Sequence, residues 1–405
     1  MTARTAFRSG TRDYYGATLG AIARIGSWVL LLIMGTAGCR GNAVKHVISP
    51  PTGLMTVYVA NSGSNTVTPI PVASNKPSNP IRVASGPQQI VISPDDKIAY
   101  VASHVDLPRR SAQLTAIRTG TNTAGKILTV CKAGDGDHVT MAITPDGGTL
   151  YYLCPTAGRV IPIRTKTMTV GRPINAGPYP DAIAITPDGR TAYVANAGST
   201  TVTPITVATN KAGKPIQVGL GPDAIAITPD GRTAYAVTPY HVTPISTATN
   251  TPGKPINVRG GHAIVITPDG ATTYVVSTPN PDSYQGVVAP IHVATNTSGR
   301  PIRVGKAPSH IAITPDGTMA YVTNLGSGTV TPIRVVNGTA DKAIRVGMAP
   351  ADLTITPDGK VVYVVNSILC LPGPCGMVTP IRVATGTAGA PVRVGRFPLG
   401  IAISS

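Results

Sequence analysis

A seven-residue phrase recurs along the chain and limits its fold more than any other feature. Ile-Ala-Ile-Thr-Pro-Asp-Gly begins at Ile183 and again at Ile225. A repeat of about 40 residues that holds four strand signals is typical of the blades of a β-propeller. We therefore predict one repeat domain rather than the two or three domains that 405 residues could form. The equivalent prolines, spaced 51, 42, 42, 39, 47 and 42 residues apart, are Pro94, Pro145, Pro187, Pro229, Pro268, Pro315 and Pro357.

Each repeat contains four predicted strands. In the unit that starts at Ile183 they span 183–186, 192–195, 201–205 and 214–218, from the innermost to the outermost. Hydrophobic residues make up 42% of the chain and aromatic residues only 4%, while 44 Gly and 39 Pro separate the β-branched runs. This composition favours short strands over helices. The predicted fold is all-β: a single propeller of four-stranded antiparallel blades.

The third strand of many repeats reads Val-Thr-Pro-Ile. Proline has no backbone N–H group, so it cannot donate to a strand ladder. We therefore predict a bulge or a local break at Pro204, Pro244, Pro332 and Pro380.

The second strand of several repeats carries a further recurring phrase. Tyr58-Val-Ala-Asn61, Tyr193-Val-Ala-Asn196 and Tyr321-Val-Thr-Asn324, together with the Pro-Asp-Gly turns, resemble the YVTN family of β-propeller repeats. The resemblance extends over residues 54–405. It implies a secreted or surface-attached bacterial propeller, and it implies no particular activity.

Counting the repeats predicts how the ring closes. The eight second-strand tyrosines are Tyr58, Tyr100, Tyr151, Tyr193, Tyr235, Tyr274, Tyr321 and Tyr363, but only seven units begin with an innermost strand. The chain ends on an extra innermost strand, Gly400–Ser404. This strand would complete the first blade and leave no exposed sheet edge. The count favours eight blades, with seven as the alternative if one unit forms no blade.

The N-terminus has the order of segments found in a signal peptide. Arg4, Arg8, Arg12 and Arg24 precede the apolar run Trp28–Met34 and then Thr36-Ala-Gly-Cys39. The last four residues resemble the bacterial lipobox, in which the cysteine receives lipid. We predict a lipoprotein-type signal peptide over 1–38, lipidation of Cys39 and a tether over 39–53. Thr36 departs from the usual aliphatic residue, so cleavage and secretion without lipid is the alternative.

The remaining four cysteines can pair in an exported protein. Cys370 and Cys375 lie in one loop, Cys-Leu-Pro-Gly-Pro-Cys. Cys131 and Cys154 follow strands whose ends emerge on one face of the propeller. Two disulfides are therefore predicted, Cys370–Cys375 and Cys131–Cys154.

Polar residues precede the innermost strand of most blades, at the mouth of the predicted central channel. An arc of carboxylates and imidazoles there could hold a divalent metal or form an acid–base pair. In the alternative interpretation each residue caps its own turn or meets solvent. The same face receives the long insertions 103–113, 278–286 and 366–377. The candidate residues are His138, Asp181, Asp223, His262, His310 and Asp352, with Gln89 at an equivalent position.

Composition narrows the functional classes. All 17 acidic residues are Asp, which excludes mechanisms that need a Glu. The net charge of +17 is spread over every repeat without a Lys/Arg run, so no nucleic-acid partner is predicted. We expect a monomeric cell-envelope binding or structural module with no obligatory cofactor. Its expected partners are the membrane, through a lipid anchor, and envelope proteins or anionic wall polymers. The alternative is a propeller lactonase or another metal-assisted hydrolase.

Overall fold

The computed structural model describes residues 55–104, 111–131, 139–280, 282–367 and 376–405. Cys39, His138, Cys370 and Cys375 lie outside these residues, as do the predicted signal peptide and tether. In the described part of the chain, no helix has the length and apolarity that a membrane crossing needs.

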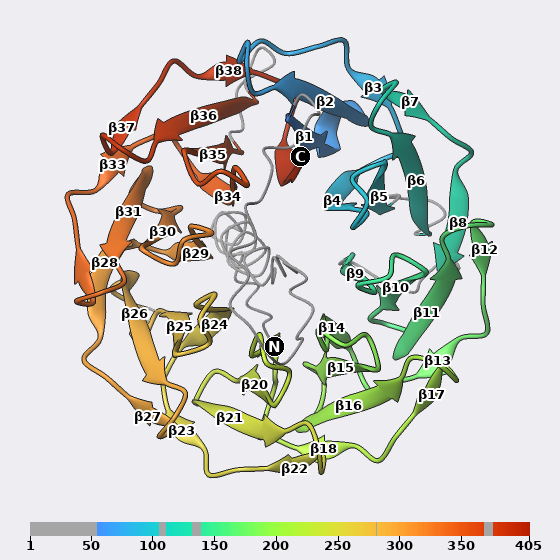
Figure 1. Ribbon diagram of the computed structural model, residues 1–405, viewed down its shortest axis with the longest axis vertical. Coiled ribbons are helices and arrows are strands. Elements are labelled where there is room, and N and C mark those ends of the chain that lie inside the picture. The colour runs from blue at the N-terminus through green and yellow to red at the C-terminus, as the bar shows by residue number, and fades with distance from the viewer. Residues whose placement is uncertain (1–54, 105–110, 132–138, 281, 368–375) are drawn as a thin grey trace, which may run out of the picture.

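Eight antiparallel sheets stand around a central axis as the blades of a propeller (Figure 1). This arrangement confirms the predicted all-β fold and the count of eight blades. Blades two to eight follow the chain in order from β4 to β38, and blade one combines β1, β2 and β3 with β39.

The strands of each blade are ordered from the axis to the rim. The innermost strands are β39 (Pro398–Ser404), β4 (Pro87–Ile92), β9 (Met141–Ile143), β14 (Pro180–Ile185), β19 (Ala224–Ile227), β24 (Gly261–Ile266), β29 (Pro308–Ile313) and β34 (Pro350–Ile355). The second strands are β1 (Thr56–Asn61), β5 (Ile98–His104), β10 (Thr149–Cys154), β15 (Thr191–Asn196), β20 (Thr233–Val237), β25 (Thr272–Ser277), β30 (Met319–Asn324) and β35 (Val361–Asn366).

The outer half of each blade follows. The third strands are β2 (Thr66–Pro71), β6 (Ala112–Arg118), β11 (Arg159–Arg164), β16 (Thr201–Thr206), β21 (His241–Ser246), β26 (Gln285–His292), β31 (Thr329–Arg334) and β36 (Met377–Arg382). The outermost strands are β3 (Ile81–Arg82), β7 (Thr123–Ala124) with β8 (Leu128–Cys131), β12 (Thr169–Val170) with β13 (Ile174–Asn175), β17 (Lys211–Ala212) with β18 (Ile216–Gln217), β22 (Thr251–Pro252) with β23 (Ile256–Asn257), β27 (Thr297–Ser298) with β28 (Ile302–Lys306), β32 (Thr339–Ala340) with β33 (Ile344–Arg345) and β37 (Thr387–Ala388) with β38 (Val392–Arg393). One short 3-10 turn, η1 (Ser62–Ser64), follows β1.

The last strand of the chain closes the ring. β39 pairs antiparallel with β1 from Thr56 opposite Ser404 to Asn61 opposite Pro398, which confirms the predicted closure. On its other side β39 packs against β4 of blade two. Gly400 fits this contact because it has no side chain: a Cβ atom there would collide with the carbonyl oxygen of Gln88.

A tyrosine in the second strand ties neighbouring blades together. The Tyr193 hydroxyl donates a hydrogen bond to Asn250 Oδ1 of the next blade at 2.7 Å. Asn250 has a φ of 56°, a left-handed conformation that asparagine tolerates better than most residues. Burial raises the pKa of Tyr193 to about 12, so its hydroxyl stays protonated and donates. The same bond joins Tyr58 to Asn122, Tyr151 to Asn210 and Tyr235 to Asn296.

The prolines of the third strands break the outermost strand instead of their own. β16 keeps an uninterrupted register with β15, with Pro204 opposite Tyr193, so the predicted bulge in the third strand is wrong. The break lies in the outer neighbour, where β17 and β18 pair with the two ends of β16. Pro204 offers no donor on this side of the ladder, and between β17 and β18 the Gly213 N–H donates to the Pro204 carbonyl at 2.7 Å.

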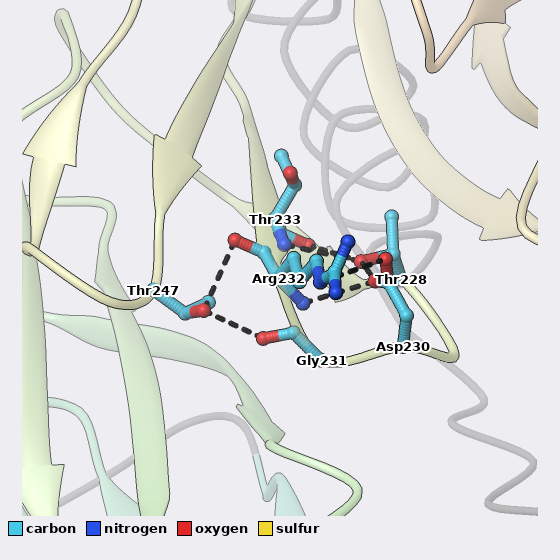
Figure 2. A network of polar contacts seen from close by, with 6 residues as sticks. All are labelled: Thr228, Asp230, Gly231, Arg232, Thr233 and Thr247. Carbon is cyan, nitrogen blue, oxygen red and sulfur yellow. Dashed lines mark hydrogen bonds and ion pairs between the residues drawn. The ribbon is translucent and has the colours of Figure 1, made fainter. Parts of the chain in front are cut away.

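The Pro-Asp-Gly turns are held by a repeated hydrogen-bond network, which Figure 2 shows for blade five. Asp230 Oδ1 accepts from the Thr228 hydroxyl at 2.5 Å and from the Arg232 N–H at 3.0 Å. The Thr247 hydroxyl, from the next turn of the blade, donates to the Gly231 carbonyl at 2.6 Å. The motif is therefore explained by turn formation, as predicted, and needs no catalytic role.

One predicted disulfide is present. Cys131, at the end of β8, is bonded to Cys154, at the end of β10, with their Cα atoms 6.0 Å apart. The bond joins blade two to blade three.

We expect Gly400→Ala to destabilise the ring at its closure. The added methyl group has no room beside Gln88, and overpacking of this kind costs about 1–3 kcal/mol in the free energy of unfolding. Gly120→Ala is the matched control, because a Cβ at Gly120 meets nothing within 4 Å. Chemical denaturation of both variants measures the difference, and equal stability would show that the closure contact is loose.

Candidate functional site

The predicted site residues lie where the innermost strands begin. In β14 the pairing with β15 shifts between Pro180 and Ala182, which leaves Asp181 as the extra residue of a β-bulge. His262 is the extra residue of the same bulge in β24. We call the residue seven positions before the proline of each Pro-Asp turn (Pro398 in blade one) the opening residue, and the side chains at the next two positions the mouth ring. Its polar members in the described residues are Gln88, Gln89, Thr140, Asp181, Asp223, His262, Ser309, His310 and Asp352.

Several side chains of the mouth ring bind the backbone of the next blade. Gln89 Oε1 accepts from the Met141 N–H at 2.7 Å. Asp352 uses the equivalent amide across the closure: its Oδ2 accepts from the Ile401 N–H at 3.3 Å. In both cases a side chain two positions after the opening proline satisfies an amide that faces the neighbouring blade. These two residues are therefore structural ties between blades.

Two hydroxyl residues make similar ties and were not among the predicted site residues. Thr140 donates to the Asp181 carbonyl at 2.9 Å, and Ser309 donates to the Ala351 carbonyl at 3.3 Å. Their position relative to the opening residue was the available signal, because it matches that of the charged residues in other blades.

His262 lies between two backbone carbonyls. Its Nε2 is 2.9 Å from the Pro308 carbonyl oxygen and its Nδ1 is 3.1 Å from that of Gly260. A neutral imidazole has one N–H group and can donate to only one of them. Burial nevertheless lowers the pKa of His262, and His310 of the next blade acts in the same direction. The imidazole is therefore held neutral and in a fixed orientation.

Asp181 and Asp223 form a carboxyl pair on neighbouring blades. Burial raises the pKa of Asp181 to about 7. Burial also raises the pKa of Asp223 well above its ordinary value, and the charge of Asp181 raises it further. The Oδ1 atom of Asp223 is buried and accepts no hydrogen bond within the described chain. Unlike Gln89 and Asp352, neither carboxyl group accepts a hydrogen bond from the backbone of the next blade within the described residues.

Alanine occupies the hydrogen-bonding position of the mouth ring in the two blades that carry this pair. Blades four and five carry Ala182 and Ala224 at the position where Gln89 and Asp352 make their ties. Their acidic residues, Asp181 and Asp223, are one position earlier, which in blade four is the bulge. In blades four and five the mouth ring therefore carries carboxyl groups that accept no hydrogen bond from the next blade, in place of the ties found in blades two and eight.

Asp352, in contrast to Asp181 and Asp223, is an acidic residue whose carboxyl group is hydrogen-bonded to the backbone. Burial raises its pKa to about 7, although the N–H groups of Leu353 and Ile401 donate to its carboxyl oxygens and act against the shift.

The structure thus brings together two pairs of the predicted residues, Asp181 with Asp223 and His262 with His310. It does not bring the whole arc together. Within the described ranges, no three His, Cys, Asp or Glu side chains lie close enough to hold a metal ion.

Comparisons with known proteins show the fold alone. No protein-family description matches the sequence, and no curated protein does. Kuenenia stuttgartiensis hydrazine synthase is similar over 74% of this chain and 96% of its own, with a TM-score of 0.58 and 22% identity. The dihydro-heme d1 dehydrogenase NirN is similar over 86% of this chain and 75% of its own, with a TM-score of 0.69 and 14% identity. A functionally unknown protein from Desulfotomaculum acetoxidans has a TM-score of 0.54 and 16% identity over 86% of this chain and 98% of its own.

We expect Asp181→Asn to stabilise the propeller above neutral pH. The pKa of Asp181 is raised from 3.8 to about 7, so its contribution to stability is full below pH about 4 and is lost as the pH rises through 7. The variant should therefore match the parent at pH 4 and exceed its free energy of unfolding by roughly 1–3 kcal/mol at pH 8. Denaturation at both pH values measures this.

Asp269→Asn is the control of opposite sign. Hydrogen bonds from the Thr267 hydroxyl and the Ala271 N–H lower the pKa of Asp269. Its contribution is present above the unfolded pKa and is lost as the pH falls, so this variant should be less stable than the parent at pH 8. If Asp181→Asn behaved like Asp269→Asn, the assignment of Asp181 as an unpaired buried carboxyl would be wrong.

Proposed function

We propose that this chain is an exported binding module of the cell envelope, whose ligand contacts the carboxyl pair Asp181 and Asp223. The repeats agree at the positions that build the blades and differ in the mouth ring. Binding residues commonly lie on the irregular connections of a rigid scaffold. The single observation that carries the proposal is the buried, unpartnered Oδ1 atom of Asp223 beside a second carboxyl group.

The chemistry of the pair indicates a ligand with an ammonium or another strong hydrogen-bond donor. A buried carboxyl group without a donor is costly, and a donor from the ligand would recover that cost. An ammonium group would favour the ionised form of Asp181 and Asp223. Because burial raises the pKa of both groups, binding near neutral pH would release protons.

The location belongs to the same proposal. A signal peptide over 1–38 and lipidation of Cys39 would leave the propeller on the outer face of the membrane, attached by a tether over 39–53. The Cys131–Cys154 disulfide supports an oxidising compartment. Metabolic labelling with a fatty acid, compared between the parent and Cys39→Ala, tests the anchor.

Hydrolysis is not proposed. The alternative of a lactonase or another metal-assisted hydrolase needs clustered metal ligands, and the described residues supply none. The two imidazoles do not replace such a cluster, because His262 is engaged with backbone carbonyls.

Calorimetry with spermidine and with benzylamine tests the proposed ligand class. We expect binding at pH 7 with proton release, seen as a dependence of the measured heat on the ionisation enthalpy of the buffer. The double variant Asp181→Asn/Asp223→Asn should lose binding by about tenfold or more.

Asp282→Asn is the control for this experiment, because Asp282 is exposed on a connection of the same face. It should bind like the parent. If neither amine bound, or if both variants bound equally well, the carboxyl pair would not be the binding site.

A further inference from the structure

The connections that enter the innermost strands carry a second set of side chains, on the outer surface of the same face. Two residues before each opening residue that the structure describes, the residue is exposed. On consecutive blades these residues include Leu220, Arg259, Lys306, Met348 and Arg396. Leu220 and Met348 are 60% and 70% exposed. The repeat therefore holds this position at the surface in every one of these blades while its chemistry varies.

Two exposed tyrosines lie beside two of these basic residues. Tyr240 and Tyr284 are 58% and 50% exposed, although the chain has few aromatic residues and buries most of its tyrosines. The Gly260 N–H donates to the Pro239 carbonyl at 2.7 Å, which places the loop of Tyr240 next to Arg259. The Ala307 N–H donates to the Tyr284 carbonyl at 2.7 Å, which places Tyr284 next to Lys306. We call Tyr240, Arg259, Tyr284 and Lys306 the tyrosine–basic arc.

The backbone of this arc is strained. Tyr284 has a φ of 52° and Ala307 a φ of 45°, in the left-handed region that residues with side chains rarely adopt. Such conformations cost free energy and persist where the surrounding structure holds them, often at binding sites. The hydrogen bond between these two residues holds both conformations and fixes the direction in which Tyr284 leaves the surface.

Acidic side chains are distributed unequally between the two faces. The seven Asp residues of the repeated turns, from Asp95 to Asp358, lie on the opposite face, where their own turns hold them. On the outer connections of the mouth face, Asp282 is the single acidic residue within the described ranges. The tyrosine–basic arc is therefore a positively charged surface with exposed aromatic rings.

We propose that the tyrosine–basic arc binds an anionic polysaccharide. The exposed faces of Tyr240 and Tyr284 can pack against the C–H faces of sugar rings, while Arg259 and Lys306 pair with carboxylate or phosphate groups on the polymer. The aromatic side chains are single and separated by basic ones, which suits an extended polymer better than the compact apolar centre of a protein interface. The inference rests on the proposed export in one respect: an exported propeller would meet such a polymer at the cell envelope.

Binding of polygalacturonate by the full chain, with neutral dextran for comparison, tests the arc. We expect polygalacturonate to bind and dextran to bind at least about tenfold more weakly. Tyr240→Ala/Tyr284→Ala should weaken polygalacturonate binding by about tenfold, and Tyr240→Phe/Tyr284→Phe should retain it because the ring face is kept. Retained binding by the Ala variant would overturn the proposal.

Charge variants separate the arc from the net charge of the chain. Arg259→Ala/Lys306→Ala should weaken binding, whereas Arg345→Ala/Arg393→Ala, an equal change of charge on the exposed outermost strands, should not. Asp282→Asn should strengthen binding, since it removes the acidic residue nearest the arc in sequence. Equal effects of the two double variants would show non-specific attraction and would contradict the arc.

Single-stranded DNA is the decisive competitor, because exposed aromatic and basic residues also bind nucleic acids. We expect oligo-dT to compete weakly. Tighter binding of oligo-dT than of polygalacturonate would replace the proposal with a nucleic-acid site. Asp181→Asn/Asp223→Asn should leave polygalacturonate binding unchanged, so failure of the arc and failure of the amine site give separate results.

Discussion

The antiparallel pairing of β39 with β1 is the contact on which the rest of the structure depends. Without it, blade one lacks its innermost strand, and blades two and eight each lose a neighbour at the axis. This pair gives blade one the innermost strand that every other blade takes from its own repeat. Asp352 and Gly400 serve the closure in different ways: one accepts the Ile401 N–H across the blade boundary, and the other allows close approach of the backbone of blade two.

Once the ring is closed, each blade must bury both faces against its neighbours. The second strands consequently have almost no exposed residue beyond their first position. Tyr193 and its equivalents meet this requirement with a large side chain whose hydroxyl reaches a turn of the next blade. Few aromatic residues are needed, since each one serves two blades.

The fold could be predicted from the sequence because the same turn and strand residues recur in every blade. The recurring Pro-Asp-Gly turn and the second-strand tyrosines predicted the blade count, and the final strand predicted the closure. The effect of Pro204 was predicted less well: its missing donor faces the outermost strand, and sequence alone does not show on which side of a ladder a donor is lost. Lipidation of Cys39 and the pairing of Cys370 with Cys375 stay predictions.

The candidate site was harder to predict, because residues at similar sequence positions do different work. Asp352 and Asp181 are both carboxyl groups near the mouth whose pKa is raised to about 7 by burial, yet one satisfies backbone amides and the other lies beside a second carboxyl group. A shift of one position at a β-bulge separates the two roles, and it becomes visible only when the pairing of the strands is known. Tyr240 and Tyr284 have no equivalent in the other repeats. Their positions beside Arg259 and Lys306 therefore could not be predicted from the sequence.

The shared first blade has a consequence for how the protein is made. Residues 56–61 and 398–404 pair in one sheet, so the ring cannot close until residues 398–404 have been delivered. If the chain is exported through a membrane with its N-terminal side first, β1 emerges before β39 and stays unpaired on its inner side until β39 arrives. Because the two segments lie side by side in one blade, a chain joined there and opened at a connection elsewhere in the ring would form the same propeller.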